Sequence, residues 1–233
     1  VLEPKLRRDQ VIGVFAGLRP LVSTDPDSPT TKLSREHVVD SPTQGFVSIA
    51  GGKYTTYRVM SEDAVNEAIN HMRKIVPDSA TETLAIIGAE GYSVLMNQIP
   101  RLAQRFGISE SSVEHLLNRY GSLMDEVLEP AQTDSSLLEP VMPGLPYLKA
   151  EILYAVTHEG ARSIDDVLSR RTRIAFEAHD QGLSVVAEIA ELISPILGWS
   201  TSEKKNSIAE YKEIIERQNA ELIVAKKEKS KVS

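Results

Sequence analysis

The spacing of apolar residues changes near Lys53 and divides the sequence into a short strand-like part and a long helical part. Before Lys53, short apolar runs at residues 11–16, 37–39 and 46–49 are separated by proline- and glycine-containing segments. Runs of this length between breakers are typical of β-strands. After Lys53, apolar residues recur every three or four positions through residue 72, which predicts an amphipathic helix that Pro77 ends.

Helical spacing continues through the rest of the chain. We predict helices over residues 94–106, 111–127, 148–157, 164–178, 183–197 and 203–227. Ser111 with Glu114, and Ser163 with Asp166, have the spacing of a capping box, in which each side chain bonds the other residue's backbone amide. These boxes predict the start of two of the helices.

Prolines mark the expected interruptions in this helical part. Pro100 lies inside the first predicted helix and predicts a kink or a break. The proline-rich residues 139–146 predict a linker between two helical groups. The fold class is therefore mainly α, with an all-α C-terminal domain at residues 77–233 and a small α/β remnant at residues 1–76.

Composition excludes several classes of function. The chain has 233 residues and no cysteine, which excludes disulfides, thiolate zinc sites and a cysteine nucleophile. Residues 1–60 carry eight Lys/Arg and six Asp/Glu, a net charge of +2, and the remainder carries 18 and 27, a net charge of −9. This acidic remainder repels a polyanion, so we expect no nucleic-acid partner. A small anion bound by the first 60 residues remains compatible with the charge.

Several familiar motifs fail on spacing. A P-loop around Gly52-Lys53 would need a glycine where Val47 stands and Ser or Thr where Tyr54 stands. A zinc-protease helix at His158-Glu159 would need a second histidine where Arg162 stands. No GxGxxG dinucleotide fingerprint occurs, and the five histidines lack ligand-like spacing, so we expect no metal site.

Three cations remain in turn-like contexts: Arg19, Arg35 and Lys53. Two guanidinium groups and an ammonium suit a phosphate dianion, since arginine binds it in a bidentate manner and lysine acts as a point charge. Gly51 and Gly52 allow a ligand to approach the backbone, and the helix that follows presents its positive end. The alternative, ordinary surface cations beside an ordinary turn, stays open on spacing alone.

The same residues resemble a known family. Phe15-Ala16-Gly17-Leu18-Arg19-Pro20-Leu21, Ser34-Arg35-Glu36-His37 and Gly51-Gly52-Lys53-Tyr54-Thr55-Thr56-Tyr57-Arg58 are similar, in order and interval, to motifs of the FAD-dependent, quinone-linked glycerol-3-phosphate dehydrogenases. The segment from Tyr154 to Arg173 resembles the family's C-terminal helical domain. The resemblance implies that this chain is the C-terminal part of such an enzyme, with the last strands of its FAD-dependent catalytic domain before the helical domain.

The resemblance also implies site roles. Arg19 and Arg35 would hold the substrate phosphate, and Lys53 would act at the junction of substrate and flavin as both a binding and a catalytic residue. Gly51, Gly52 and Thr55 would approach the FAD ring beside Lys53. No metal is implied, and we expect this chain alone neither to retain FAD nor to oxidise the substrate, because the FAD fingerprint lies upstream in the family.

The implied reaction converts sn-glycerol 3-phosphate to dihydroxyacetone phosphate and passes the electrons to a quinone. A cytoplasmic protein bound peripherally to the inner face of the membrane is expected, and a homodimer is left open. Two alternatives also stay open. One is an oxygen-dependent alpha-glycerophosphate oxidase of the same family, and the other is a helical domain that serves only for interaction or membrane docking.

Overall fold

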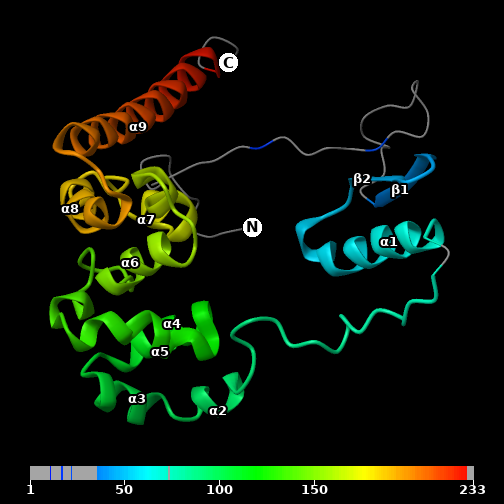
Figure 1. The fold of residues 1–233 in the computed structure, drawn as a ribbon. Helices are drawn as coiled ribbons and strands as arrows, with labels where there is room; N and C mark the ends of the chain where they lie inside the picture. Colours follow the sequence, from blue (N-terminus) through cyan, green and yellow to red (C-terminus); the bar gives the residue numbers. More distant parts are fainter. Residues whose placement is uncertain (1–10, 12–16, 18–21, 23–35, 73, 230–233) are drawn as a thin grey trace. The chain divides into compact units, whose positions relative to one another are not determined.

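The structure, a computed structural model, describes residues 11, 17, 22, 36–72 and 74–229. Within these residues, one compact unit ends at Ile86 and a second begins at Ile87. We call residues 36–86 the hairpin unit and residues 87–229 the helical unit, and each is described by itself (Figure 1). The predicted boundary at residues 76–77, which concerns the parent domains, stays a prediction.

The hairpin unit is built on two antiparallel strands, β1 (His37–Thr43) and β2 (Phe46–Gly51). In their register, His37 lies opposite Gly51. The strand expected at residues 37–39 continues to Thr43 through a register shift, because an irregular edge strand tolerates Pro42. Residues 12–16, the other predicted strand, lie outside the described residues.

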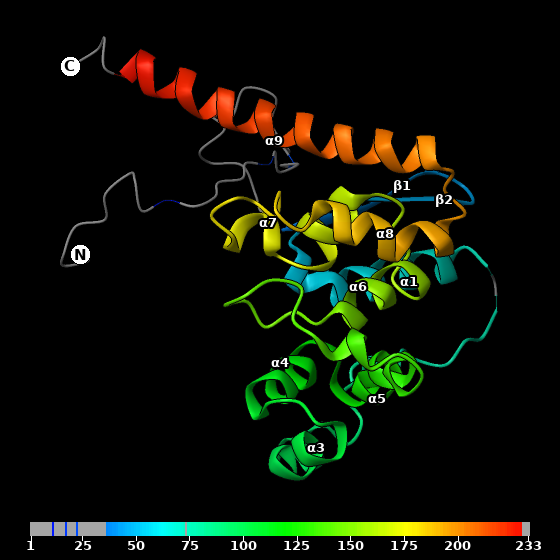
Figure 2. The same ribbon diagram turned by 90° about the vertical axis from the view of Figure 1, so that its left-hand side faces the viewer.

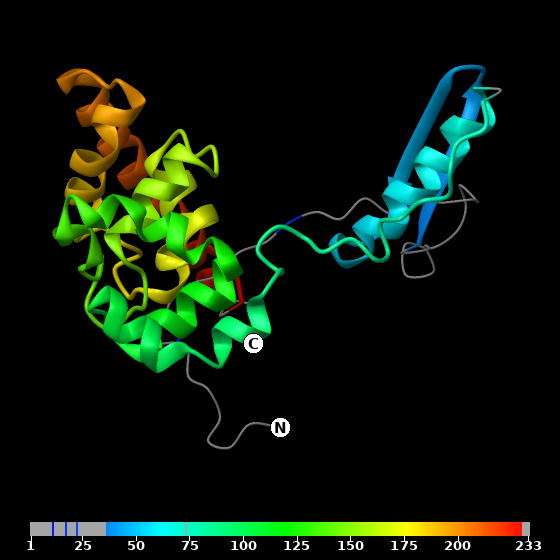
Figure 3. The same cartoon turned by 60° about the horizontal axis from the view of Figure 1, so that its bottom comes forward.

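Helix α1 (Tyr57–Asn70) follows the short 3-10 turn η3 (Tyr54–Thr56) and lies along the hairpin (Figure 3). It ends well before Pro77, contrary to the prediction. Its packing partner explains this end: α1 contacts the two strands, while Ile75 beyond it is fully exposed and has no apolar surface to cover.

Two side-chain bridges tie β1 to α1. His37 Nε2 donates to Asp63 Oδ2 at 2.6 Å, and the Ser41 hydroxyl is hydrogen-bonded to His71 Nε2 at 2.7 Å. No residue of α1 is fully buried. The helix is therefore attached to the strands by half-buried side chains together with these two polar bridges.

The helical unit confirms the predicted mainly α fold (Figures 1 and 2). Its α-helices in chain order are α2 (Tyr92–Met96), α3 (Ile99–Phe106), α4 (Glu110–Tyr120), α5 (Met124–Leu128), α6 (Lys149–Thr157), α7 (Ile174–Glu177), α8 (Val186–Leu197) and α9 (Thr201–Lys229). Short 3-10 turns and one π-helical segment, η7 (Asp166–Arg171), connect them. The predicted last helix is thus confirmed as α9, which begins beside α8 and continues past it (Figure 2).

Helix α6 joins the two hydrophobic cores of the helical unit. Ala150 and Tyr154 pack into the core formed mainly by α3, α4 and α5. Ile152 and Ala155 pack into the other core. Residues of α7, α8 and α9 complete this core, among them Tyr211 of α9. Apolar residues on both sides of this helix are therefore buried.

Two predicted helices are each broken in two. The helix expected at residues 111–127 divides at Gly121, which has φ +58°. A Cβ there would lie 1.9 Å from the carbonyl oxygen of Gly88, which also accepts from the Ser122 amide at 2.9 Å. The chain thus crosses itself at contact distance, which an uninterrupted helix would not permit.

The helix expected at residues 164–178 divides at Thr172. Its backbone is extended there, with ψ −176°, between η7 and α7. The Thr172 amide and hydroxyl both donate to the Val167 carbonyl at 2.8 Å, and the hydroxyl also lies 3.3 Å from the Leu168 carbonyl. The side chain thus adds a donor to the carbonyls at the end of η7.

The cap predictions have mixed outcomes. Ser163 and Asp166 form the predicted reciprocal pair: the Asp166 amide donates to Ser163 Oγ at 3.0 Å, and Asp166 Oδ2 accepts from the Ser163 amide at 3.1 Å. The Ser111 box is wrong, since Ser109 caps α4 by accepting from the Ser112 amide at 3.0 Å. The N-cap of α4 is therefore Ser109, two residues before the serine of the predicted box. Pro100 breaks the first predicted helix as expected, because it stands in the opening turn of α3.

Residues 139–146, predicted as a linker, do stand between the two helical groups, but they also belong to the core. Val141 is buried, and its amide donates to the Tyr147 carbonyl at 2.8 Å. The Lys149 amide donates to the Glu139 carbonyl at 3.0 Å. The segment is therefore fixed by backbone pairing and burial, despite its prolines.

Candidate functional site

The turn between β2 and η3 requires both of its glycines. Gly51 and Gly52 have φ +78° and +79°, a region that other residues rarely adopt. A Cβ on Gly51 would lie 2.7 Å from the Glu36 carbonyl oxygen, and one on Gly52 would lie 2.5 Å from Met60 Sδ. Fold geometry alone thus accounts for two glycines at this point.

Lys53 begins the helical segment with its side chain in the open. Its amide donates to Thr56 Oγ1 at 3.2 Å, and the Thr56 hydroxyl donates back to the Lys53 carbonyl at 3.0 Å. These bonds fix the Lys53 backbone in an extended conformation before η3. Among the described residues, none forms an ion pair or hydrogen bond with its ammonium group, which leaves it available to an anion.

A surface groove of about 930 Å³ lies along this turn. Lys53 is the one cation among its lining residues in the described part of the chain. The remaining lining residues are mostly apolar or aromatic side chains from β2, η3 and α1: Ile49, Gly51, Gly52, Tyr54, Thr55, Tyr57, Met60, Ser61, Ala64 and Val65. Tyr54 is 92% exposed, so the groove presents a single positive charge beside uncovered aromatic surface.

The groove collects part of the predicted site. Gly51, Gly52, Lys53 and Thr55 all line it, as the resemblance places them beside one ligand. Arg19 and Arg35 lie outside the described residues. The binding and catalytic roles of these residues therefore stay predictions.

Sequence reasoning missed the apolar wall of the groove. Tyr57, Met60, Ser61 and Ala64 face it from α1 at spacings of three and four residues. That spacing marks one face of a helix, so the signal was present in the sequence. The amphipathic pattern predicts the helix but not a groove along this face, where Tyr57 is 53% exposed.

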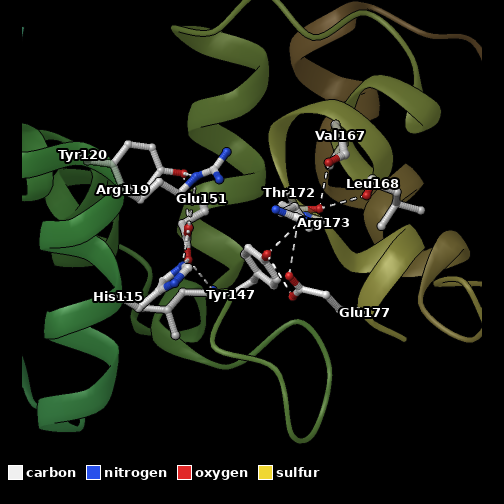
Figure 4. A network of polar contacts seen from close by, with 11 residues as sticks. His115, Arg119, Tyr120, Tyr147, Glu151, Val167, Leu168, Thr172, Arg173 and Glu177 are labelled. Carbon is white, nitrogen blue, oxygen red and sulfur yellow. Dashed lines mark hydrogen bonds and ion pairs between the residues drawn. The ribbon is translucent and has the colours of Figure 1, made fainter. Parts of the chain in front are cut away.

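A second polar cluster lies inside the helical unit around Glu151 (Figure 4). This α6 side chain is fully buried, and its carboxylate accepts from three groups. The donors are the Leu148 amide at 2.8 Å, His115 Nε2 at 3.0 Å and the Tyr120 hydroxyl at 3.1 Å. Arg119 Nε lies 3.9 Å away. With several donors and a nearby cation, the buried carboxylate is satisfied and ties α4 to α6.

Tyr147 extends this cluster towards α7. Its ring packs edge-on against the His115 ring, and its hydroxyl donates to Glu177 Oε2 at 3.1 Å while accepting from the Arg173 amide at 3.2 Å (Figure 4). Burial, together with the Glu177 carboxylate, raises the pKa of the Tyr147 hydroxyl to about 12. The phenol is therefore a stable hydrogen-bond donor and gives no sign of acid–base chemistry near neutral pH.

Glu159 is the one side chain in the described part of the chain with a buried oxygen that lacks a hydrogen-bond partner, Oε2. Burial raises the pKa of its carboxyl above the ordinary value, and the nearby charges of Arg119 and Arg171 oppose this shift. Protonation would relieve the cost of leaving that oxygen unpaired.

The arginines near η7 are engaged in contacts within the helical unit. Arg170 pairs with Asp165 and Asp166, and Arg173 lies 3.6 Å from Glu177. Arg171 Nε donates to the Glu159 carbonyl at 2.9 Å. Their charges are therefore engaged within the helical unit.

The described residues contain neither a metal-ligating cluster nor a membrane-spanning helix. No group of three or more histidine, aspartate or glutamate side chains there is arranged to hold a metal ion. No helix in the same part of the chain has both the length and the apolar character needed to cross a bilayer.

Comparisons with known proteins place this geometry in context. Residues 79–204 match the family model for the C-terminal domain of alpha-glycerophosphate oxidase. Over 211 residues the chain is 44% identical to glycerol-3-phosphate dehydrogenase 2 of Mycobacterium tuberculosis, covering 91% of this chain and 36% of that protein. It is 36% identical over 210 residues to the mitochondrial glycerol-3-phosphate dehydrogenase of Bos taurus, covering 88% of this chain and 28% of that protein.

A solved structure has the same fold. The glycerol-3-phosphate dehydrogenase of Bacillus halodurans, complexed with FAD, aligns with a TM-score of 0.56 at 24% identity, over 71% of this chain and 34% of that one. The chain thus spans about a third of the length of the proteins it matches.

Proposed function

Because the chain belongs to the family defined by the C-terminal domain of alpha-glycerophosphate oxidase, we propose that it is the C-terminal part of an FAD-dependent glycerol-3-phosphate dehydrogenase. The parent enzyme would oxidise sn-glycerol 3-phosphate to dihydroxyacetone phosphate and pass the electrons to a quinone. We place it in the cytoplasm, bound peripherally to the inner face of the membrane, where a quinone is within reach.

The observation that carries this proposal is the groove beside Lys53. Its ammonium, which has no partner among the described residues, the left-handed backbone of Gly51 and Gly52, and the exposed Tyr54 and Tyr57 fit one side of a flat ring system that becomes anionic on reduction. The hairpin unit presents no GxGxxG fingerprint for the rest of FAD. These residues therefore fit part of a flavin site, as the C-terminal segment of such an enzyme would.

Each residue has a distinct proposed role. FAD, when bound, supplies the acceptor for the hydride leaving the substrate carbon. Lys53 would stabilise negative charge that develops on the substrate oxygen, and the amide groups of η3 would add positive potential at the same place. Arg19 and Arg35 would hold the phosphate and so orient the substrate in the groove.

The test uses the full-length protein that contains this chain, purified with its flavin. We expect Lys53→Met to retain FAD but to lower kcat for glycerol 3-phosphate by about 100-fold or more, as is typical when a group that stabilises transition-state charge is removed. Lys74→Met removes an exposed cation of the same unit that does not line the groove, and should leave kcat unchanged. Equal turnover in Lys53→Met and wild type would remove Lys53 from the site.

The electron acceptor is tested separately. Anaerobic turnover with a soluble quinone analogue, without peroxide formation in air, is the result expected for a dehydrogenase. Rapid peroxide formation with no response to quinone would identify the oxygen-dependent oxidase instead. The 233-residue chain alone should purify colourless, and a bound flavin spectrum would show that it holds more of the FAD site than proposed.

A further inference from the structure

His37 lies where three parts of the hairpin unit meet. Its backbone stands opposite Gly51 in the register of β1 and β2. Its ring nitrogen Nε2 donates to Asp63 Oδ2 on α1 at 2.6 Å. Its Cβ would be 3.2 Å from a Cβ placed on Gly52. The residue thus contacts the strand pair, the helix and the glycine turn together.

Two side chains lie close to the glycine turn. A Cβ placed on Gly52 would be 3.2 Å from His37 Cβ and 2.5 Å from Met60 Sδ. Met60 and Asp63 are separated by one turn of α1, so the His37–Asp63 bond sets how closely this part of the helix approaches the strands. Lys53 follows Gly52 directly, and its position depends on that spacing.

We propose that His37 and Asp63 are positioning residues for the Gly51-Gly52-Lys53 turn, a role that rests on the proposed function of the groove. Neither residue lines the groove, so neither touches a ligand there. The pair holds α1 at the distance from β1 that directs the Lys53 ammonium into the groove. Its loss would move the cation rather than remove it.

The contact is suited to setting geometry more than stability. The His37 side chain is 19% exposed and that of Asp63 is 47% exposed, and bonds between such partly solvated groups contribute little to the free energy of unfolding. Displacing a group that acts on the reacting atoms by about 1 Å, in contrast, lowers turnover by about 100-fold.

The second bridge between the same elements supplies a matched control. Ser41 and His71 also join β1 to α1, at 2.7 Å, near the opposite end of the helix from Lys53. Neither residue lines the groove. Ser41→Ala therefore loosens the helix without disturbing the glycine turn.

The experiment compares His37→Ala, Asp63→Ala and Ser41→Ala in the full-length flavoenzyme. We expect kcat for glycerol 3-phosphate to fall about 10- to 100-fold in the first two, with KM changed less than about twofold, since binding of the phosphate is retained. Ser41→Ala should keep the wild-type kcat, while its thermal stability should fall by about as much as that of the other two variants. Equal kcat losses in all three variants, or none in His37→Ala, would overturn the proposal.

Conservative variants separate positioning from folding. Asp63→Asn retains an acceptor for His37 and should restore at least half of the wild-type kcat; failure to improve on Asp63→Ala would count against the proposal. Where Asp63→Ala does not fold, Asp63→Asn is compared with wild type, and a kcat less than about a tenth of the wild-type value would count against the proposal.

A second readout is independent of catalysis. In the 233-residue chain, His37→Ala should speed hydrogen exchange at the hydrogen-bonded Lys53 and Thr56 amides about tenfold relative to Ser41→Ala. An inactive wild-type enzyme would refute the proposed function, and this exchange comparison would still decide whether the pair positions the turn. Identical exchange in the two variants would show that it does not.

Discussion

Replacing Glu151 with alanine should be among the most destabilising single changes in the helical unit. The substitution leaves the Leu148 amide, His115 Nε2 and the Tyr120 hydroxyl without their acceptor. A buried polar group left unpaired costs about 1–3 kcal/mol, and removal of one member of a buried charged cluster costs about 3–5 kcal/mol. His115 is 17% exposed, so water can replace part of its lost hydrogen bond. We therefore expect the cost of removing one member of a buried charged cluster, about 3–5 kcal/mol, and not a larger total from three separately unpaired groups.

This loss is large enough to measure by thermal unfolding. For a domain of about 150 residues, each kcal/mol shifts Tm by about 2–4 °C, so Glu151→Ala should lower Tm by about 6–20 °C. Far-UV circular dichroism of the 233-residue chain reports the transition, because the helical unit provides most of the helical signal. Urea unfolding of the same samples should show a lower midpoint at an unchanged slope.

Two further variants make the comparison specific. Glu191→Ala removes an exposed partner of Lys204, an ion pair worth about 0–1 kcal/mol, and should shift Tm by no more than about 4 °C. Glu151→Gln keeps the side-chain volume and one acceptor oxygen, so its cost should be smaller, about 1–3 kcal/mol. A Glu151→Ala protein that melts within about 3 °C of wild type would refute the reasoning, since water would then replace the carboxylate without loss.

Two other predictions concern the same unit. Gly121→Ala should lower the free energy of unfolding, measured in urea, by at least about 2 kcal/mol, because its Cβ would meet the Gly88 carbonyl oxygen at 1.9 Å. Gly107 also has a positive φ but open space around it, so Gly107→Ala should cost only about 1 kcal/mol. Equal losses in the two variants would contradict the close approach at Gly121. Burial raises the pKa of Glu159, so its stabilising protonation is complete below the ordinary carboxyl pKa and is lost as pH rises through the raised value. Glu159→Gln should therefore match wild type near about pH 4 and exceed it in urea midpoint near about pH 8, whereas the exposed Glu213→Gln should show no such divergence.

Periodicity predicted the elements that bury a continuous apolar stripe. The last two predicted helices are found as α8 and α9, and Pro100 marks a true break, because each signal is local. The breaks at Gly121 and Thr172 were missed, since the first depends on a distant carbonyl and the second on the additional donor that the Thr172 hydroxyl supplies at the end of η7. Nothing in a helical repeat records such contacts.

Only part of the candidate site could be predicted from the sequence. Gly51, Gly52 and Lys53 could be singled out because two consecutive glycines and a lysine before a predicted helix form a short, recognisable motif. In the structure both glycines have a left-handed backbone and Lys53 lines the groove. The hydrogen bond between His37 and Asp63 joins residues 26 positions apart and follows no periodic rule. Only the register of the hairpin brings His37 beside the turn.

The position of α6 limits how the helical unit can open. Residues of this helix are shared between two cores, so neither core can be exposed without removing a wall from the other. Partial unfolding that spares one half is therefore costly, and the two halves behave as a single cooperative foldon. An insertion or a proteolytic cut inside α6 would consequently disable both halves together.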